Sequence, residues 1–146
     1  TPLSVTSLSQ EKVYDDLFSL ENETEMDHIS LSRWSDVILV APATANTIAK
    51  LSSGYSDDLA STVMLASNKD IFLAPAMNVR MWENDSTKEN INKLKNYGFN
   101  LIGPEIGDMA CGEFGEGKMS EPEQIVKKIE NYFDSLSKNS LSKVAY

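Results

Sequence analysis

The sequence predicts an α/β fold, a three-layer, doubly wound parallel sheet, and three observations indicate it. Short, wholly apolar runs at Val37–Val40 and Ile71–Ala74 are typical of parallel strands that are covered on both faces. Amphipathic segments with capping residues lie between and after these runs. Strand and helix alternate from residue 37 to residue 136, which is the order of a parallel sheet with helices on its faces.

The beginning of the chain gives weaker signals. Thr1–Gln10 is polar and has no strong period, so no regular element is expected there. Val13–Phe18 is expected to form a short strand or a helical turn, and Glu21–Asp27 an acidic loop. His28–Trp34 is expected to be a short helix that leads into the strand Val37–Val40.

The middle of the chain contains two helices and the second strand. Asn46–Leu51 is predicted to be a short helix that ends near Gly54. Ser56–Asp58 is expected to cap the next helix, whose apolar residues recur at helical spacing. The strand Ile71–Ala74 is expected to end at Pro75, because proline has no N–H for the ladder.

A helix and a short strand follow. Asn84–Tyr97 is predicted to be a helix that opens with a capping box of Ser86 and Glu89 and ends at Gly98. Phe99–Ile102 is the third and last clear strand, whereas doubly wound sheets usually contain five or six.

The last third of the chain is predicted to contain a loop and a long helix. Ile106–Met119 contains four glycines and is expected to be a flexible loop. Ser120 and Glu123 have capping-box spacing and are expected to open a helix that reaches Leu136. The polar residues 137–146 are predicted to be a linker or the start of a following domain, so that the domain proper is residues 1–136.

Composition limits the possible functions. The 146 residues suffice for one domain, and the formal net charge of -9 argues against nucleic acid as a partner. No apolar run is long enough to cross a membrane, and no signal peptide is visible. With one cysteine there is no internal disulfide, which favours a cytoplasmic location. The one histidine and the one cysteine lie far apart in the sequence, so no metal site is expected.

Both longer strands run into similar sequences. Val37–Val40 continues into Ala-Pro-Ala-Thr-Ala-Asn-Thr at residues 41–47, and Ile71–Leu73 continues into Ala-Pro-Ala-Met-Asn at residues 74–78. Ligands bind at the carboxyl ends of the strands in an open α/β sheet. We therefore expect one shared site at this edge.

Four motifs in the chain resemble those of the homo-oligomeric flavin-containing cysteine decarboxylases. Residues 42–47 are similar to that family's Pro-Ala-Ser-Ala-Asn-Thr motif, and residues 75–82 match its Pro-x-Met-Asn-x-x-Met-Trp motif at every fixed position. Residues 110–119 resemble the cysteine loop, and residues 28–36 the histidine motif, of the branch that acts on phosphopantothenoylcysteine.

The resemblance implies a cytoplasmic, FMN-dependent carboxy-lyase of coenzyme A biosynthesis with a Rossmann-like or flavodoxin-like flavoprotein fold. Its substrate would be 4′-phosphopantothenoylcysteine. The flavin would oxidise the substrate thiol, CO2 would leave, and the resulting enethiolate would be protonated and reduced to 4′-phosphopantetheine. The family binds FMN between the subunits of a trimer, so a homotrimer or a higher homo-oligomer is expected.

Family members begin with a strand, a Gly/Ser-rich turn that holds the flavin phosphate, a helix and a second strand. We find no counterpart of this first β-α-β unit, and residues 141–146 resemble the approach to the synthetase domain of the bifunctional bacterial proteins. The chain is therefore expected to be a piece of a longer reading frame that lacks the N-terminal part.

Two catalytic residues follow from the resemblance. His28 is expected to act on the carboxyl end of the substrate, since an imidazole can donate to a carboxylate. Cys111 is expected to protonate the enethiolate, because a thiol has a pKa closer to neutrality than a hydroxyl. By residue type alone, His28 could be an exposed helix-start residue and Cys111 a small buried hydrophobe.

The resemblance also implies residues that bind the substrate and the cofactor. Asn78 is expected to hold the substrate carboxylate without adding a cation that would oppose the loss of CO2. By residue type alone it could be an ordinary turn residue. The other expected substrate contacts are Ala110 and Met119. The residues expected to contact the flavin are Thr44, Ala45, Asn46, Thr47 and Ala76, although residues 44–47 also fit a plain capped turn.

Two other kinds of function remain possible. A peptidyl-cysteine decarboxylase or a flavin prenyltransferase would share the fold, but Cys111 in its glycine-rich loop argues against both. A non-catalytic regulatory relative or an inert fragment is the second alternative. The presence of His28, Asn78 and Cys111 argues against a decayed site.

Overall fold

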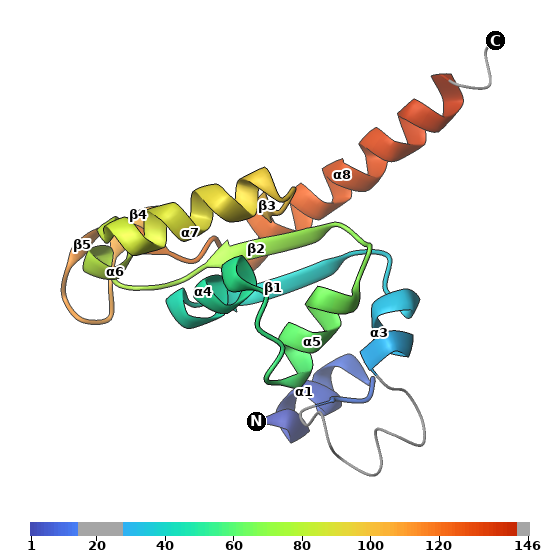
Figure 1. The fold of residues 1–146 in the computed structure, drawn as a ribbon, viewed down its shortest axis with the longest axis horizontal. Coiled ribbons are helices and arrows are strands. Elements are labelled where there is room, and N and C mark those ends of the chain that lie inside the picture. Colours follow the sequence, from blue (N-terminus) through green and yellow to red (C-terminus); the bar gives the residue numbers. More distant parts are fainter. Residues whose placement is uncertain (15–27, 143–146) are drawn as a thin grey trace.

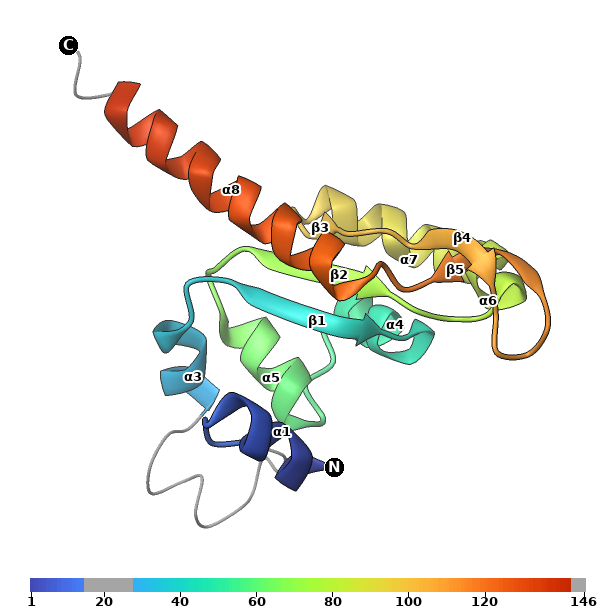
Figure 2. The same ribbon diagram turned by 180° about the vertical axis from the view of Figure 1, so that it is seen from behind.

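The computed structural model describes residues 1–14 and 28–142 and has the predicted three-layer α/β architecture (Figures 1 and 2). Its centre is a parallel sheet of three strands in the order β1-β2-β3. The strands are β1 (Ile38–Ala43), β2 (Ile71–Pro75) and β3 (Asn100–Leu101). A separate antiparallel hairpin consists of β4 (Glu105–Asp108) and β5 (Phe114–Lys118).

Helices cover both faces of the sheet. On one face lie α4 (Ala45–Ser53), α5 (Leu59–Ala66) and α7 (Asp85–Asn96). On the other lies α8 (Pro122–Ser142). The described part also contains α1 (Pro2–Ser9), α3 (His28–Trp34) and the short α6 (Val79–Glu83).

Strand β2 shows why the sheet needs helices on both faces. All its residues are buried, and successive side chains alternate between two apolar clusters. Ile71 and Leu73 pack into the cluster that contains Ile48 of α4, Met64 of α5 and Leu94 of α7. Phe72 and Ala74 pack into the cluster that contains Ile125 of α8.

The strand ends differ from those expected. β1 continues through Pro42 to Ala43, and β2 includes Pro75, so neither strand stops before its proline. Ala43 pairs with Pro75 after a register shift that follows Val40. The irregularity accommodates Pro42, which has no N–H to donate, within an edge strand of the sheet.

Most helix boundaries are confirmed. α3 spans the predicted residues, α4 ends at Gly54 with a φ of 73°, and Asp58 caps α5 through a 2.7 Å hydrogen bond from the backbone N–H of Ser61. Lys50 reaches back from α4 to Asp57 at 2.8 Å and to Asp58 at 3.3 Å. Hydrogen bonds from Ser61 and the ammonium of Lys50 lower the pKa of Asp58.

Both predicted capping boxes are wrong. The side chain of Asn84 caps α7 by accepting from the N–H of Ser86, so Ser86 already lies inside the helix. Ser120 is buried and donates to the carboxylate of Glu105 at 2.8 Å, so it does not cap α8. A different local cap has replaced the first box, and a tertiary hydrogen bond has replaced the second.

Two helix boundaries at the ends of the chain differ from those expected. Residues 2–9 form α1, which Thr1 caps and which starts with Pro2, although none of its side chains is buried. α8 continues through the residues expected to be a linker as far as Ser142. The domain boundary after residue 136 stays a prediction, and Glu21–Asp27, like most of Val13–Phe18, lies outside the described residues.

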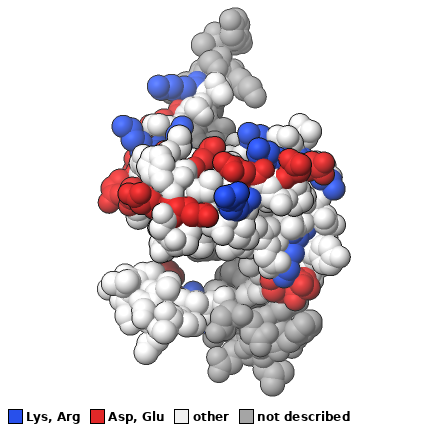
Figure 3. Space-filling view, turned by 90° about the vertical axis from the view of Figure 1, so that its left-hand side faces the viewer, with Lys and Arg blue, Asp and Glu red and all other residues white. Residues whose placement is uncertain are grey.

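The predicted loop at Ile106–Met119 is mostly the hairpin β4-β5. On the face of the molecule that carries this hairpin, acidic and basic side chains lie interspersed in a band (Figure 3). α8 extends well beyond the sheet (Figures 1 and 2).

Candidate active site

The segments that leave β1 and β2 run side by side at the carboxyl edge of the sheet. Ala43 and Pro75 are register partners, and the N–H of Ala76 donates to the carbonyl oxygen of Ala43 at 3.1 Å. The sequence after Ala43 therefore lies next to the sequence after Pro75, as expected for one shared site.

The segment after β1 forms the start of α4. Thr44 is the N-cap, and its Oγ1 accepts from the N–H of Thr47 at 3.2 Å and lies 3.1 Å from the hydroxyl of Thr47. As first residues of a helix, Ala45 and Asn46 have backbone N–H groups with no intrahelical acceptor. No acidic residue lies in this first turn. The turn thus offers two amide donors and two hydroxyls to a ligand with hydrogen-bond acceptors.

The segment after β2 places Asn78 at the start of α6. Asn78 is exposed, and its Oδ1 accepts from the N–H of Met81 at 2.8 Å. This bond uses the carbonyl oxygen of the carboxamide, so the amide Nδ2–H groups are left to donate to a ligand. Ala76, two residues earlier, is half-buried between the two segments.

Cys111 lies in the turn of the hairpin β4-β5. The N–H of Met109 donates to the carbonyl of Glu113 at 2.8 Å, and the N–H of Gly112 to the carbonyl of Met109 at 2.9 Å. Cys111 is an exposed free thiol whose Sγ lies 4.0 Å from Oε2 of Glu113. Cys111 is therefore not the small buried hydrophobe that its residue type alone allows.

The hairpin is joined directly to the segment after β2. The N–H of Met77 donates to the carbonyl of Gly117 at 3.0 Å, and α6 packs against β5. Cys111 and Asn78 therefore belong to the same end of the molecule (Figures 1 and 2).

The two remaining expected substrate contacts differ from each other. Ala110 is exposed next to Cys111 in the hairpin turn. Met119 follows β5, is partly buried, and packs against the apolar cluster under α8. The structure thus gives Met119 a packing contact and leaves Ala110 accessible.

His28 does not join the other site residues within one chain. It is the first residue of α3, which lies at the end of the sheet where β1 begins, whereas α6 and β5 lie beyond the end of β2 (Figures 1 and 2). One copy of the chain therefore brings residues 44–47 next to Ala76 and Asn78 and joins the hairpin of Cys111 to the same segment, whereas His28 lies at the other end of the sheet.

Two features of the site were not expected from the sequence. One is the carboxylate of Glu113, the nearest acceptor to the thiol of Cys111. The other is the glycine face of the hairpin, at Gly115 and Gly117, which packs against the Met77–Val79 segment. The alternating spacing Gly-x-Gly could have indicated one face of a strand.

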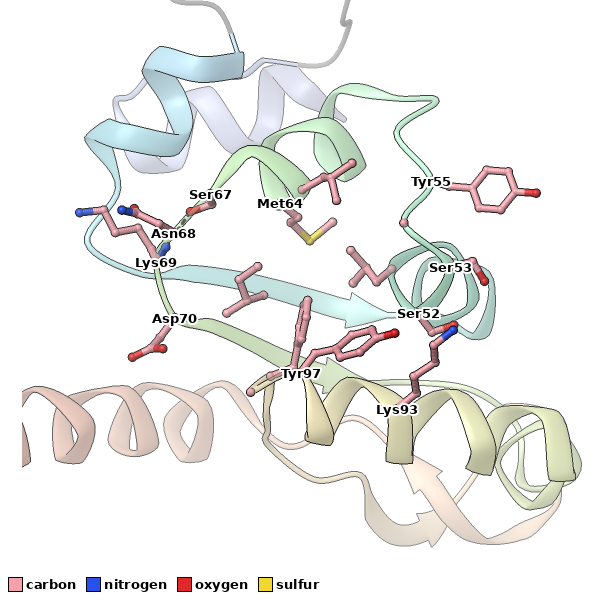
Figure 4. Close-up of a pocket in the computed structure, with 16 residues that line it drawn as sticks. Ser52, Ser53, Tyr55, Met64, Ser67, Asn68, Lys69, Asp70, Lys93 and Tyr97 are labelled. Carbon is pink, nitrogen blue, oxygen red and sulfur yellow. Dashed lines mark hydrogen bonds between the residues drawn. The ribbon is translucent and has the colours of Figure 1, made fainter.

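A separate cavity of about 610 Å³ lies at the other end of the sheet (Figure 4). It is lined by the last residues of α4, α5 and α7 and by Asp70–Ile71 at the start of β2. Met64 points into it, and Tyr97 and Lys93 of α7 lie along its side (Figure 4). None of the expected site residues lines this cavity.

Within the described residues, no three His, Cys, Asp or Glu side chains gather in a way that could hold a metal ion. None of their helices combines the length and the hydrophobicity needed to cross a bilayer.

Comparisons with known proteins agree with the resemblance. The model of the flavoprotein family matches residues 1–134. The coenzyme A biosynthesis bifunctional protein CoaBC of Haemophilus influenzae is 44% identical over 133 residues, which cover 91% of this chain and 33% of that protein. The chain thus spans about a third of the length of this curated relative.

Solved structures give the same result. A PPC decarboxylase mutant complexed with pantothenoylaminoethenethiol matches with a TM-score of 0.76 and 34% identity, over 84% of this chain and 71% of that one. The FMN binding protein AtHal3 matches with a TM-score of 0.75 and 35% identity, over 85% and 70%.

Proposed function

This chain belongs to the flavoprotein family, and from that premise we propose that it is the part of a coenzyme A biosynthesis enzyme that decarboxylates 4′-phosphopantothenoylcysteine. The product is 4′-phosphopantetheine, and the cofactor is FMN. The observation that carries the proposal is the Met77–Gly117 hydrogen bond, which joins the segment of Asn78 to the hairpin of Cys111 at one end of the molecule.

The start of α4 fits an FMN ring. The N–H groups of Ala45 and Asn46 and the hydroxyls of Thr44 and Thr47 are donors for ring carbonyls and nitrogens, and no carboxylate in this turn competes with them. Ala76 contributes only a methyl group beside them, which leaves room for a flat ligand. The chemistry that FMN supplies when bound is reversible two-electron oxidation at the carbon that bears the substrate thiol.

The residues of the chain bind the substrate and move one proton. The Nδ2 amine of Asn78 donates to the substrate carboxylate and orients it, and because the amide is neutral it does not hold back the developing CO2. The thiol of Cys111 gives its proton to the carbon of the enethiolate that remains after CO2 has left. Glu113 stands 4.0 Å away, where it accepts a hydrogen bond from that thiol between turnovers.

We propose that the active form is a homotrimer or a higher homo-oligomer in the cytoplasm. His28 lies in α3, at the opposite end of the sheet from Asn78, so a neighbouring copy must supply the imidazole that binds the substrate carboxyl end (Figures 1 and 2). Cys111 is exposed and must stay a free thiol, and the reducing cytoplasm keeps it so.

The chemistry can be tested on the protein expressed from its natural gene. We expect a flavin absorption spectrum and release of CO2 from phosphopantothenoylcysteine. Cys111→Ser should still release CO2 but should accumulate the oxidised enethiol. Absence of both the flavin and the CO2 would overturn the proposal, and CO2 release from peptides that end in cysteine would favour the peptidyl-cysteine decarboxylase.

Mixing variants tests the composite site. His28→Ala and Asn78→Ala proteins should each be nearly inactive, but subunits exchanged between them should regain part of the activity, because some sites then combine two intact residues. A mixture that stays inactive although mass spectrometry shows mixed oligomers would place both residues in the same chain's site.

A further inference from the structure

The inner face of the hairpin is glycine because the backbone of the neighbouring segment comes too close for any side chain. A Cβ atom built on Gly117 would lie 2.4 Å from the carbonyl oxygen of Met77 and 3.2 Å from Cε of Met109. A Cβ built on Gly115 would lie 2.9 Å from Cγ2 of Val79. Gly117 also has a φ of 144°, a conformation that other residues rarely adopt.

The contact at Gly117 joins the Met77 segment to the hairpin that carries Cys111, and Gly117 itself lies at a register shift of the β4-β5 ladder. The N–H of Met77 donates to the carbonyl of Gly117 at 3.0 Å, and Met77 directly precedes Asn78. From Gly117, β5 pairs with β4, with Gly107 opposite Gly115 and Asp108 opposite Phe114.

The far end of the hairpin is closed by short backbone bonds. The Met109–Glu113 and Gly112–Met109 hydrogen bonds, of 2.8 Å and 2.9 Å, hold the turn that carries Cys111. The positions of the Cys111 thiol and the Asn78 carboxamide are thus linked through backbone groups, and Gly117 is the residue at which the hairpin meets the Met77 segment.

We propose that Gly117 is a positioning residue for the protonation step: its missing side chain lets the hairpin lie against Met77 and so sets the thiol of Cys111 against a substrate that Asn78 holds. This inference rests on the proposed function. When this contact is lost, CO2 still leaves but the enethiolate escapes before Cys111 protonates it; the two electrons taken from the substrate would stay on the cofactor, and dissolved oxygen in the assay would have to accept them before the next turnover. The sensitive quantity is therefore the ratio of oxidised to reduced product, which does not depend on how much enzyme is folded.

The test is Gly117→Ala in the product of the natural gene, with Gly98→Ala as the matched control. Gly98 has a φ of 93°, but a Cβ there would meet nothing within 4 Å, so the control carries a comparable backbone penalty without the clash. We expect Gly117→Ala to raise the ratio of oxidised enethiol to 4′-phosphopantetheine by roughly tenfold or more, and Gly98→Ala to leave it at the wild-type value. An unchanged ratio in Gly117→Ala would overturn the inference.

A second readout does not depend on the reaction. Hydrogen exchange measured by mass spectrometry should become roughly tenfold faster in residues 76–82 and 105–118 of Gly117→Ala, because the Met77–Gly117 bond is lost. Gly98→Ala should not change these segments. If the wild-type protein releases no CO2, the proposed function fails, while this exchange result still decides whether Gly117 fixes the hairpin.

A rescue experiment covers the case in which Gly117→Ala does not fold. Gly115→Ala should raise the product ratio because its Cβ meets the methyl groups of Val79. Adding Val79→Ala leaves only the Val79 Cβ, 3.5 Å away, which is ordinary contact, so the ratio should return toward the wild-type value. A double variant no better than Gly115→Ala would refute the argument that close approach at this face sets the position of Cys111.

Discussion

Asn78 has two roles on opposite sides of its carboxamide, and one pair of substitutions separates them. Its Oδ1 caps α6 by accepting from the N–H of Met81 at 2.8 Å, while its Nδ2 amine is proposed to hold the substrate carboxylate. Asn78→Asp keeps an acceptor for the cap and replaces the donor with a negative charge. Asn78→Ala removes both.

The two variants should therefore differ in stability, while both lose activity. Loss of an N-cap costs about 1 kcal/mol, which lowers the Tm of a domain of this size by about 2–4 °C. Asn78→Ala should show this shift, whereas Asn78→Asp should stay within about 0.5 kcal/mol of wild type, since Asp and Asn are comparable N-caps. A hydrogen bond to a charged group contributes about 1.5–3 kcal/mol, so kcat/KM should fall roughly 10- to 150-fold in both variants.

Thermal unfolding and CO2 release measure the two effects separately. Repulsion between the new carboxylate and the substrate carboxylate should make Asn78→Asp the less active of the two variants. The reasoning is refuted if Asn78→Asp releases CO2 at the wild-type rate, or if it loses as much Tm as Asn78→Ala.

Three further predictions concern stability. Leu94 is fully buried between α7 and β2, so Leu94→Ala should lower the free energy of unfolding by about 2–5 kcal/mol, measured by urea denaturation; a loss below about 1 kcal/mol would contradict the packing. Because the pKa of Asp58 is lowered, its carboxylate stabilises the folded protein above the unfolded pKa near 4, and this stabilisation is lost as the pH falls through the lower folded pKa. Asp58→Asn should keep the cap but flatten the loss of Tm below about pH 4. An unchanged dependence of Tm on acid pH would contradict this role of Asp58. The Tyr132 hydroxyl donates a hydrogen bond to Asp70, which raises the pKa of Tyr132. The bond therefore stabilises the folded protein fully below pH 10 and ceases to do so as the pH rises through the folded pKa. Tyr132→Phe should lower the free energy of unfolding by about 1 kcal/mol at neutral pH, and equal unfolding midpoints for the two proteins would exclude the bond.

The layers of the fold could be predicted from the sequence because they depend on apolar patterning. The buried run Ile71–Ala74 and the stripe that contains Ile91 and Leu94 identify a two-faced strand and a one-faced helix without tertiary information. The hairpin β4-β5 could not be predicted in this way. Its inner face is glycine, which has a low strand propensity, and its side chains Ile106 and Phe114 are 68% and 70% exposed, so no apolar alternation indicates a strand and the Gly-x-Gly spacing is the one signal of it.

The site was only partly predictable for a related reason. The carboxyl ends of two neighbouring strands must meet, so the closeness of Thr44 and Asn78 follows from the strand order alone. The position of Cys111 depends on the contact between Gly117 and Met77, which no local signal reports. The separation of His28 from Asn78 follows from the chain order, because α3 leads directly into the start of β1 whereas Asn78 follows the carboxyl end of β2.

The outer edge of β1 has practical consequences for handling the molecule. In the described part of the chain, no strand pairs with this edge, and the neighbouring side chain of Leu39 is 42% exposed. Unpaired backbone N–H and C=O groups beside apolar side chains are a template on which extended chains add and aggregate. Pro42 and the register shift after Val40 limit such pairing to the first half of β1, and light scattering as a function of concentration would show whether this edge causes association.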